Sequence, residues 1–230
     1  MPDPRAVRAM FARIARRYDL LNRLLSMGVD RRWRSALVEE LGPGRAGLVV
    51  DSCCGTGDLS AALERSGARV LGVDFTLPML VRAREKRGRT LFVGGDALRL
   101  PVRDGAADAT TIAFGLRNLA DRAQGLRELA RIVRPGGRVL VLEFSLPPAR
   151  WLRALYRLYF TRILPRIGGW ISGEPAAYRY LPDTVLVWPD PDELRAEMEA
   201  VGLEQCGYRR LTGGIACLSW GRVATRAPCR

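Results

Sequence analysis

Short apolar segments alternate with helical segments along most of this chain, and this alternation constrains the fold more than any other feature of the sequence. The strand candidates are residues 47–51, 69–74, 90–93, 109–114 and 139–144. The helices predicted among them are residues 59–65, 79–86 and 121–133. Strands that alternate with helices favour a mainly parallel sheet with helices on both faces, so the predicted class is α/β.

The C-terminal part of the chain departs from this alternation. A helix is predicted at residues 191–200, and two strand candidates follow at 203–211 and 214–221. The turn between these strands, Thr212-Gly213-Gly214, is very short. A parallel pair needs a crossover of a dozen or more residues, so we predict an antiparallel hairpin.

The N-terminal part is predicted to be helical over residues 10–41, with a break at Gly28. Apolar side chains from Met10 through Tyr18 to Trp33 follow one continuous helical stripe. We therefore interpret this Arg-rich start as folded structure rather than as a targeting peptide.

The chain has the size of one medium domain and no sign of a second. It contains 230 residues, without an internal repeat or a low-complexity linker. We predict a single domain over residues 1–230, with an N-terminal helical cap at 5–41 and an insertion at 147–185 that faces the substrate or a membrane.

The composition excludes several kinds of chemistry. The chain has no histidine, which excludes Ser-His-Asp hydrolysis, Cys-His proteolysis and His-ligated metal sites. Its five cysteines form no CxxC pair, and the adjacent Cys53 and Cys54 are unsuited to a zinc knuckle or an ordinary disulfide. We predict no metal site and a cytoplasmic location. No apolar run approaches the roughly 20 residues of a membrane span.

A glycine turn between the first predicted strand and helix is a candidate ligand site. It reads Asp51-Ser52-Cys53-Cys54-Gly55-Thr56-Gly57-Asp58, and its backbone N–H groups can meet the polar end of a ligand. A turn of this kind is also compatible with a purely structural connection. A dinucleotide is disfavoured, because its fingerprint requires glycine or alanine where this chain has Ser60.

Three acids are predicted to share one rim of the sheet beside this turn. Asp51 and Asp74 end the first two strands, and Asp96 follows the third within Gly94-Gly95-Asp96-Ala97. Carboxylates in these places can accept hydrogen bonds from ribose hydroxyls and from an adenine amino group. S-adenosylmethionine fits this rim, because it carries a sulfonium charge, a ribose and an adenine but no phosphate.

Further motifs extend the pattern over almost the whole chain. They are Tyr18-Asp19-Leu20-Leu21-Asn22, Gly55-Thr56-Gly57-Asp58 and the segments 112–118, 141–145, 167–169, 171–173, 178–182 and 211–215. From Met10 to Gly221 the chain resembles the menaquinone and ubiquinone biosynthesis C-methyltransferase family, nearest its menaquinone-type members. The resemblance implies the class I, Rossmann-like methyltransferase fold, with a mainly parallel seven-stranded sheet.

The resemblance also implies a cofactor site for S-adenosylmethionine. The cofactor-binding residues are predicted to be Asp51, Gly55, Thr56, Gly57, Asp74, Phe75, Asp96, Ala97 and Ala113. Two departures from the family stand out. Cys53-Cys54 replaces the usual small residues, and Ser219 replaces a common histidine.

The reaction implied is C-methylation of a prenylated quinol ring, with demethylmenaquinol as the expected acceptor. A quinol hydroxyl loses its proton, and the phenolate directs electron density to the ring carbon that takes the methyl group. Arg117 and Asn118 are predicted to hold the quinolate oxygen, and Tyr18 to close over the ring. Arg117 cannot be the base, because its guanidinium does not release a proton.

A helix predicted within residues 149–170 bears on the partners. Its apolar face is expected to comprise Leu152, Leu155, Tyr156, Tyr159, Phe160 and Ile163, with Arg150, Arg153 and Arg157 directed away. This pattern fits a core helix, or an interfacial helix that rests on anionic lipid and admits a polyprenyl tail. The predicted partners are thus the quinol and an anionic membrane surface, at the inner face of the cytoplasmic membrane. A homodimer is also compatible with the sequence.

Other functions remain open at this point. They are the corresponding methylation in ubiquinone biosynthesis, a small-molecule methyltransferase of secondary metabolism and a non-catalytic scaffold that binds the cofactor. The net charge of +13 is also compatible with a nucleic-acid-binding protein, which is a further alternative. We predict no nucleic acid partner, because the arginines are spread out and a base-flipping motif is missing.

Overall fold

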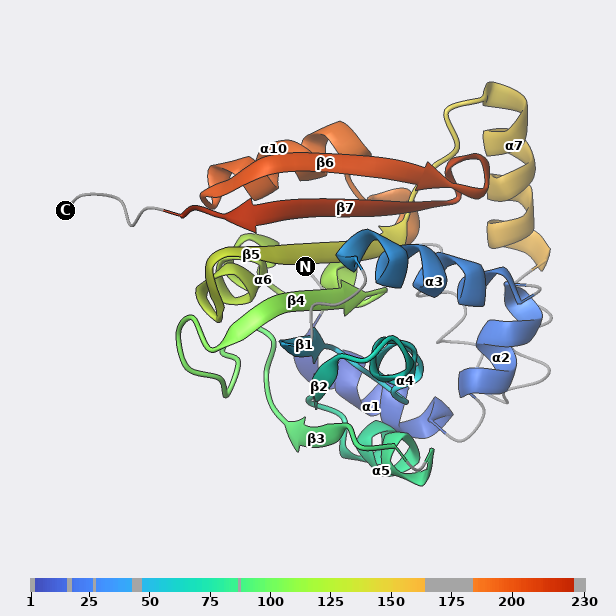
Figure 1. The fold of residues 1–230 in the computed structure, drawn as a ribbon. Coiled ribbons are helices and arrows are strands. Elements are labelled where there is room, and N and C mark those ends of the chain that lie inside the picture. The colour runs from blue at the N-terminus through green and yellow to red at the C-terminus, as the bar shows by residue number, and fades with distance from the viewer. Residues whose placement is uncertain are drawn as a thin grey trace.

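A seven-stranded sheet forms the centre of the molecule (Figure 1). The computed structural model describes residues 3–15, 18–26, 28–42, 47–86, 88–163 and 184–225. The strands are β1 (Leu48–Ser52), β2 (Arg69–Asp74), β3 (Leu91–Gly94), β4 (Ala107–Ala113), β5 (Val133–Phe144), β6 (Leu203–Leu211) and β7 (Ala216–Val223). Their order is β3-β2-β1-β4-β5-β7-β6.

Of the seven described strands, β1 to β6 run in one direction and β7 runs in the opposite direction. β1 pairs in parallel with β2 and β4, β2 with β3, and β4 with β5. β7 lies between β5 and β6 and is antiparallel to both. The predicted mainly parallel sheet and the predicted antiparallel hairpin are confirmed, and the carboxyl ends of β1 to β5 share one rim.

Helices cover both faces of the sheet, as predicted. They are α1 (Pro4–Ile14), α2 (Tyr18–Leu25), α3 (Val29–Leu41), α4 (Asp58–Arg65), α5 (Leu77–Glu85), α6 (Arg122–Arg131), α7 (Arg150–Leu158) and α10 (Pro191–Ala200). Leu37 of α3 and Leu63 of α4 pack with Leu140 on one face. Leu129 of α6 packs with the neighbouring Val141 on the other face, together with α10. Adjacent β5 residues thus serve opposite layers, because side chains alternate along a strand.

The N-terminal region differs from the single helical stripe that the sequence predicts. It begins at Pro4, before residue 10, and forms three helices. The break at Gly28 is confirmed, since this residue has φ +75°, which favours glycine. The stripe itself is wrong: Phe11 and Tyr18 lie in different helices, and their rings meet edge to face, 6.0 Å between centroids. The apolar period continues because both helices face the same cluster.

β5 also differs from its prediction, because it begins at Val133 rather than at residue 139. Val133 pairs with Ala107 and Arg138 with Ala109, with an irregularity between them. A Cβ at Gly137 would lie 2.5 Å from the Asp108 carbonyl oxygen, so glycine is required there. The Pro135-Gly136-Gly137 segment, which lies beyond the end of α6 at Arg131, is therefore part of a bulged strand.

A third apolar cluster closes the carboxyl rim. It joins Ile14 of α1, Met79 of α5, Tyr156 of α7 and Val185. This cluster fixes the N-terminal helices and α7 above the strand ends. The predicted helix over 149–170 is described as far as η2, a π-helical turn at Tyr159–Ile163. Trp170 and the motifs at 167–169, 171–173 and 178–182 lie outside the described residues.

Candidate active site

The turn after β1 holds its shape through an unusual backbone. Cys53, Gly55 and Gly57 have φ of +53°, +53° and +77°, in the left-handed region. A Cβ at Gly57 would lie 3.0 Å from the Phe92 ring, whereas one at Gly55 would meet nothing within 4 Å. Gly57 is thus required by packing as well as by its backbone, and Gly55 leaves open space above the rim.

Asp74, at the end of β2, supports this turn from the next strand. Its carboxylate accepts hydrogen bonds from Gly55 N (2.9 Å) and Thr76 N (2.8 Å). Burial raises the pKa of this carboxyl, and the backbone N–H donors oppose the rise. One side chain therefore fixes both the glycine turn and the start of α5.

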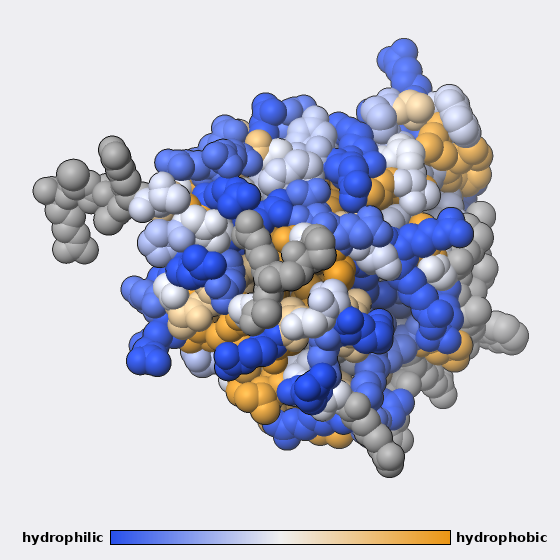
Figure 2. Space-filling model, viewed as in Figure 1, coloured by the Kyte–Doolittle hydropathy of each residue, from blue (hydrophilic) through white to orange (hydrophobic). Residues whose placement is uncertain are grey.

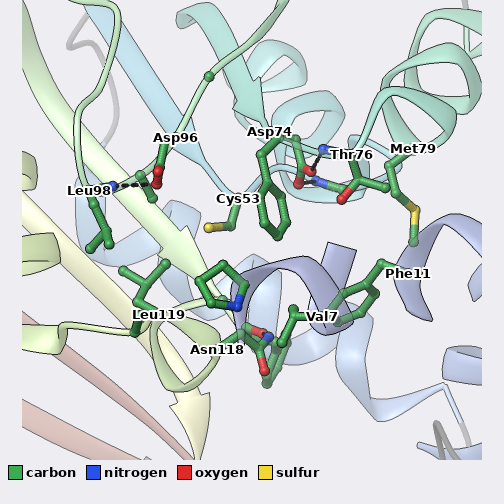
Figure 3. Close-up of a pocket in the computed structure, with 18 of the residues that line it drawn as sticks. Val7, Phe11, Cys53, Asp74, Thr76, Met79, Asp96, Leu98, Asn118 and Leu119 are labelled. Carbon is green, nitrogen blue, oxygen red and sulfur yellow. Dashed lines mark hydrogen bonds between the residues drawn. The ribbon is translucent and has the colours of Figure 1, made fainter. Parts of the chain in front are cut away.

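A cavity opens between this rim and α1 (Figure 3). Asp74 and Asp96 lie on one side of it, and Val7 and Phe11 of α1 face them from across the opening, near Asn118 (Figure 3). The predicted site residues that line it are Tyr18, Gly55, Asp74, Phe75, Asp96, Ala97, Ala113 and Asn118. Most of the predicted cofactor site and two of the three predicted catalytic residues therefore come together.

Four predicted residues, Asp51, Thr56, Gly57 and Arg117, do not belong to the described lining of this cavity. Asp51 lies beneath the turn, where it accepts hydrogen bonds from Ser60 Oγ (2.6 Å) and Thr111 Oγ1 (3.1 Å). Its burial raises its pKa to about 6. Asp51 thereby links β1 to α4 and to β4. It supports the glycine turn from below and does not line the cavity.

Thr56 is held by α2, one of the N-terminal helices. Its hydroxyl donates to Asp19 Oδ1 of α2 at 2.5 Å. Lys86, the only lysine of the chain, lies 3.0 Å from Asp19 Oδ2 and pairs with Asp58. A polar network of α2, α4 and the residue after α5 therefore fastens α2 beside the glycine turn.

Arg117 and Glu143 form a buried ion pair at the ends of β4 and β5. Arg117 lies in η1, a 3-10 turn at Leu116–Asn118, and its Nη1 is 2.5 Å from Glu143 Oε1. Nη1 also donates to the Phe114 carbonyl (2.7 Å), which accepts a second bond from Asn118 Nδ2 (3.3 Å). Phe114 has φ +57°. This strained residue joins the two predicted catalytic side chains.

The electrostatics of the acids suit a cationic ligand. None of Asp51, Asp74 and Asp96 forms an ion pair within the described residues. Their hydrogen bonds come from neutral hydroxyls and backbone N–H groups, including Leu98 N to Asp96 (2.9 Å). Over the same residues no group of three or more His, Cys, Asp or Glu could hold a metal.

Several residues of the site are not predicted from the sequence. Glu143 stands in a quoted motif without a role, and Val7, Phe11 and Asp19 are not named as site residues. Glu143 could have been found because it is an acid near the end of a buried strand, β5. The neighbouring strand, β4, leads to Arg117. Ser219, at the place of the family histidine, is buried in β7 opposite Val141 and does not line the cavity.

The sheet order, the reversed last strand and the polar rim define a class I S-adenosylmethionine-dependent methyltransferase. Solved structures share this fold at low identity. The Haloferax volcanii methyltransferase in complex with its Trm112 activator matches with a TM-score of 0.68, at 19% identity over 93% of this chain and 97% of that one. A SAM-dependent methyltransferase from Thermotoga maritima matches with a TM-score of 0.67, at 18% identity over 93% and 98%.

Sequence comparison places the chain more closely. The model of the ubiE/COQ5 methyltransferase family matches residues 2–223, and the chain belongs to this family. A demethylmenaquinone methyltransferase of Thermus thermophilus is 51% identical over 92% of this chain and 99% of the relative. A ubiquinone/menaquinone biosynthesis C-methyltransferase UbiE of Syntrophotalea carbinolica is 48% identical over 93% and 92%. The predicted family, methyltransferase class and cofactor are confirmed.

Proposed function

We propose that this protein transfers a methyl group from S-adenosylmethionine to a ring carbon of demethylmenaquinol, which yields menaquinol. The observation that carries this proposal is the 51% identity, over nearly the full length of both chains, to a protein named demethylmenaquinone methyltransferase. The cavity at the strand ends supports the proposal, because it would give the cofactor and the acceptor a place to meet.

The residues around the glycine turn fit the cofactor. Gly55 leaves open space where a Cβ would stand, and Asp74 and Asp96 line the cavity without a cationic partner among the described residues. Asp74 would accept hydrogen bonds from the ribose, and Asp96 with Ala97 would receive the adenine. When bound, S-adenosylmethionine supplies a methyl group whose bond to sulfur breaks as the bond to the ring carbon forms, after which that carbon loses its proton.

The residues after β4 fit the acceptor. Arg117 and Asn118 share the Phe114 carbonyl, so both side chains are fixed in one arrangement. The Arg117 guanidinium and the Asn118 amide would stabilise the negative oxygen of the quinolate, and fixed donors need no reorganisation as charge develops. Tyr18 lines the cavity and would pack over the ring, while burial raises its pKa and keeps its hydroxyl neutral.

The test is methyl transfer from labelled S-adenosylmethionine to three acceptors in parallel. These are demethylmenaquinol, the 2-methoxy-6-polyprenyl-benzoquinol of ubiquinone biosynthesis, and total RNA. We expect label in menaquinol. Label in the benzoquinol alone would support the ubiquinone reaction, to which the UbiE name of some relatives also refers. Label in RNA, or in none of the three despite cofactor binding, would overturn the proposal in favour of a nucleic-acid enzyme or a scaffold.

We further propose that α7 rests on an anionic membrane surface, where a polyprenyl substrate is found. Trp151, Leu155 and Leu158 are 68%, 56% and 46% exposed along one side of the helix. Figure 2 shows apolar residues gathered on α7, at the upper right. The expected apolar face is thus divided, since Tyr156 packs inward while Leu155 faces solvent. None of the described helices has the length and apolar character of a membrane crossing.

Vesicle binding tests this surface. Arg150 and Arg157 are exposed on α7, whereas Arg153 Nε donates to the Pro147 carbonyl (2.8 Å) and belongs to the structure of the helix start. We expect Arg150→Gln/Arg157→Gln to weaken binding to vesicles with anionic lipid, at about 1 kcal/mol for each charge. Arg127→Gln/Arg195→Gln is the charge-matched control on α6 and α10. Equal binding of both double variants would contradict the proposal.

The oligomeric state is a separate question. Light scattering gives the molar mass of the parent protein in solution and so tests whether it forms a homodimer.

A further inference from the structure

Glu143 is a buried acid that the proposed function does not use. Its side chain is 1% exposed and that of Arg117 is 6% exposed. The Glu143 carboxylate accepts from Arg117 Nη1, from Arg117 N (3.3 Å) and from Phe144 N (3.0 Å). Burial raises the pKa of Glu143, and the guanidinium beside it opposes the rise. A buried charge pair of this kind adds little net stability compared with apolar side chains, so its presence calls for another reason.

The described hydrogen bonds of the Arg117 guanidinium are made by Nη1. Nη1 makes the hydrogen bonds to Glu143 and to the Phe114 carbonyl, and the group lies over the Phe144 ring, with 5.1 Å from Cζ to the centroid. Nε is buried and has no hydrogen-bond partner in the described structure. A guanidinium presents Nε–H and one Nη2–H in the same direction, which allows two parallel bonds to one oxyanion.

The geometry points to Glu143 as a positioning residue for methyl transfer. By fixing Nη1, Glu143 turns the Nε–Nη2 side of Arg117 toward the oxyanion of the methyl acceptor, which is the quinolate if the proposed function holds. The carboxylate also makes it possible to keep the guanidinium charged while it is buried. The substrate then meets a donor that is already oriented, so little reorganisation is needed as negative charge develops.

The experiment compares Glu143→Gln with a matched change elsewhere. Glu128 is also buried and pairs with Arg131 at 2.7 Å, but on α6 and outside the described cavity lining. We expect Glu143→Gln to lower kcat for demethylmenaquinol roughly 10- to 100-fold, with cofactor Kd and acceptor KM changed less than about threefold. Glu128→Gln should leave kcat unchanged. Calorimetric cofactor binding and thermal melting show that both variants are folded, and Glu143→Asp replaces Glu143→Gln if the latter does not fold.

Combining Glu143→Gln with a change of Arg117 shows whether Glu143 positions Arg117 or has only a general structural effect. If Glu143 acts through Arg117, adding Glu143→Gln to Arg117→Lys should lower kcat little further, whereas independent roles would multiply. Unchanged kcat in Glu143→Gln, or a multiplicative loss in the double variant, overturns the inference. Activity of the parent on demethylmenaquinol is measured alongside. If the parent fails there, the proposed function itself is wrong, and these outcomes are thus distinguishable.

Discussion

The two halves of the carboxyl rim treat buried charge in opposite ways. Around β1 and β2, Asp51 and Asp74 are held by hydroxyls and backbone N–H groups, and neither forms an ion pair among the described residues. Around β4 and β5, Glu143 is held by the guanidinium of Arg117. Acids that lack a cationic partner would suit a cationic ligand, and a guanidinium that is fixed by an acid would suit an anion that forms during the reaction, as the proposed function requires.

We call the half around β1 and β2 the cofactor half and the half around β4 and β5 the acceptor half. The largest effect is expected from removing Arg117, the cation of the acceptor half. Arg117→Ala leaves Glu143 as a buried carboxylate without its partner, which should lower the free energy of unfolding by about 3–5 kcal/mol. Methyl transfer should fall by about 100-fold or more, because an oxyanion donor is lost. Urea denaturation and steady-state kinetics measure the two losses.

A double variant separates the loss of stability from the loss of methyl transfer. Arg117→Met/Glu143→Met removes both charges, so it should recover most of the lost stability but none of the activity. If it recovered activity as well, Arg117 would be a structural residue only, and the contrast between the two halves would fail.

The next effect concerns the cofactor half. Asp74→Asn removes the charged acceptor offered to the ribose, a loss on the order of 1.5–3 kcal/mol, or roughly tenfold to over a hundredfold in cofactor affinity. Titration calorimetry measures it. Asp108→Asn is the control, since Asp108 accepts from Leu48 N at the opposite end of the strands. Equal affinity in the two variants would refute a cofactor site at Asp74.

An acid without a cation should also show in the pH dependence of stability. The pKa of Asp51 is raised from 3.8 to about 6, so the folded state holds this proton more tightly than the unfolded state. Its contribution is complete below pH 4 and is lost as pH rises to about 6, and the loss is on the order of 3 kcal/mol. Asp51→Asn should therefore gain stability relative to the parent over this range. A constant difference in urea midpoints from pH 4 to 7 would contradict it.

The smallest effect, on cofactor affinity, is expected from removing the charge of Lys86, which lies outside the rim formed by Asp51, Asp74 and Asp96. Lys86 is 28% exposed, and its partners Asp19 and Asp58 are 38% and 37% exposed. Solvent screens such pairs, so Lys86→Gln should change cofactor affinity by less than about fivefold. Calorimetry at low and high salt measures this. A larger loss would mean that α2 must be fastened to the glycine turn before the cofactor can bind.

Local patterns in the sequence predict the elements well. The bounds of β2, β6 and α10 agree with the sequence, because each element begins and ends at a strong signal, such as Asp190 and Pro191 at the start of α10. β5 does not, because its bulge depends on contact with β4. The strand acids indicate where the cofactor half lies, since parallel strands end at one rim.

Contacts between distant residues are not predicted in the same way. Arg117 and Glu143 both lie in motifs that resemble the family, within residues 112–118 and 141–145, but only the pairing of β4 with β5 brings them together. Thr56 is predicted as a cofactor contact, whereas its hydroxyl meets Asp19 of a helix that precedes the sheet. Such pairings depend on how separate elements pack, which no local period records.

The place of β7 between β5 and β6 bears on how the chain can be made. β6 leaves the ribosome before β7, yet among the described strands β6 pairs only with β7. Until Ala216–Val223 has been synthesised, β6 lacks its partner among the described strands and the edge of β5 is open to other chains. A premature stop between residues 212 and 215 would thus spare β6 in sequence but lose it from the sheet.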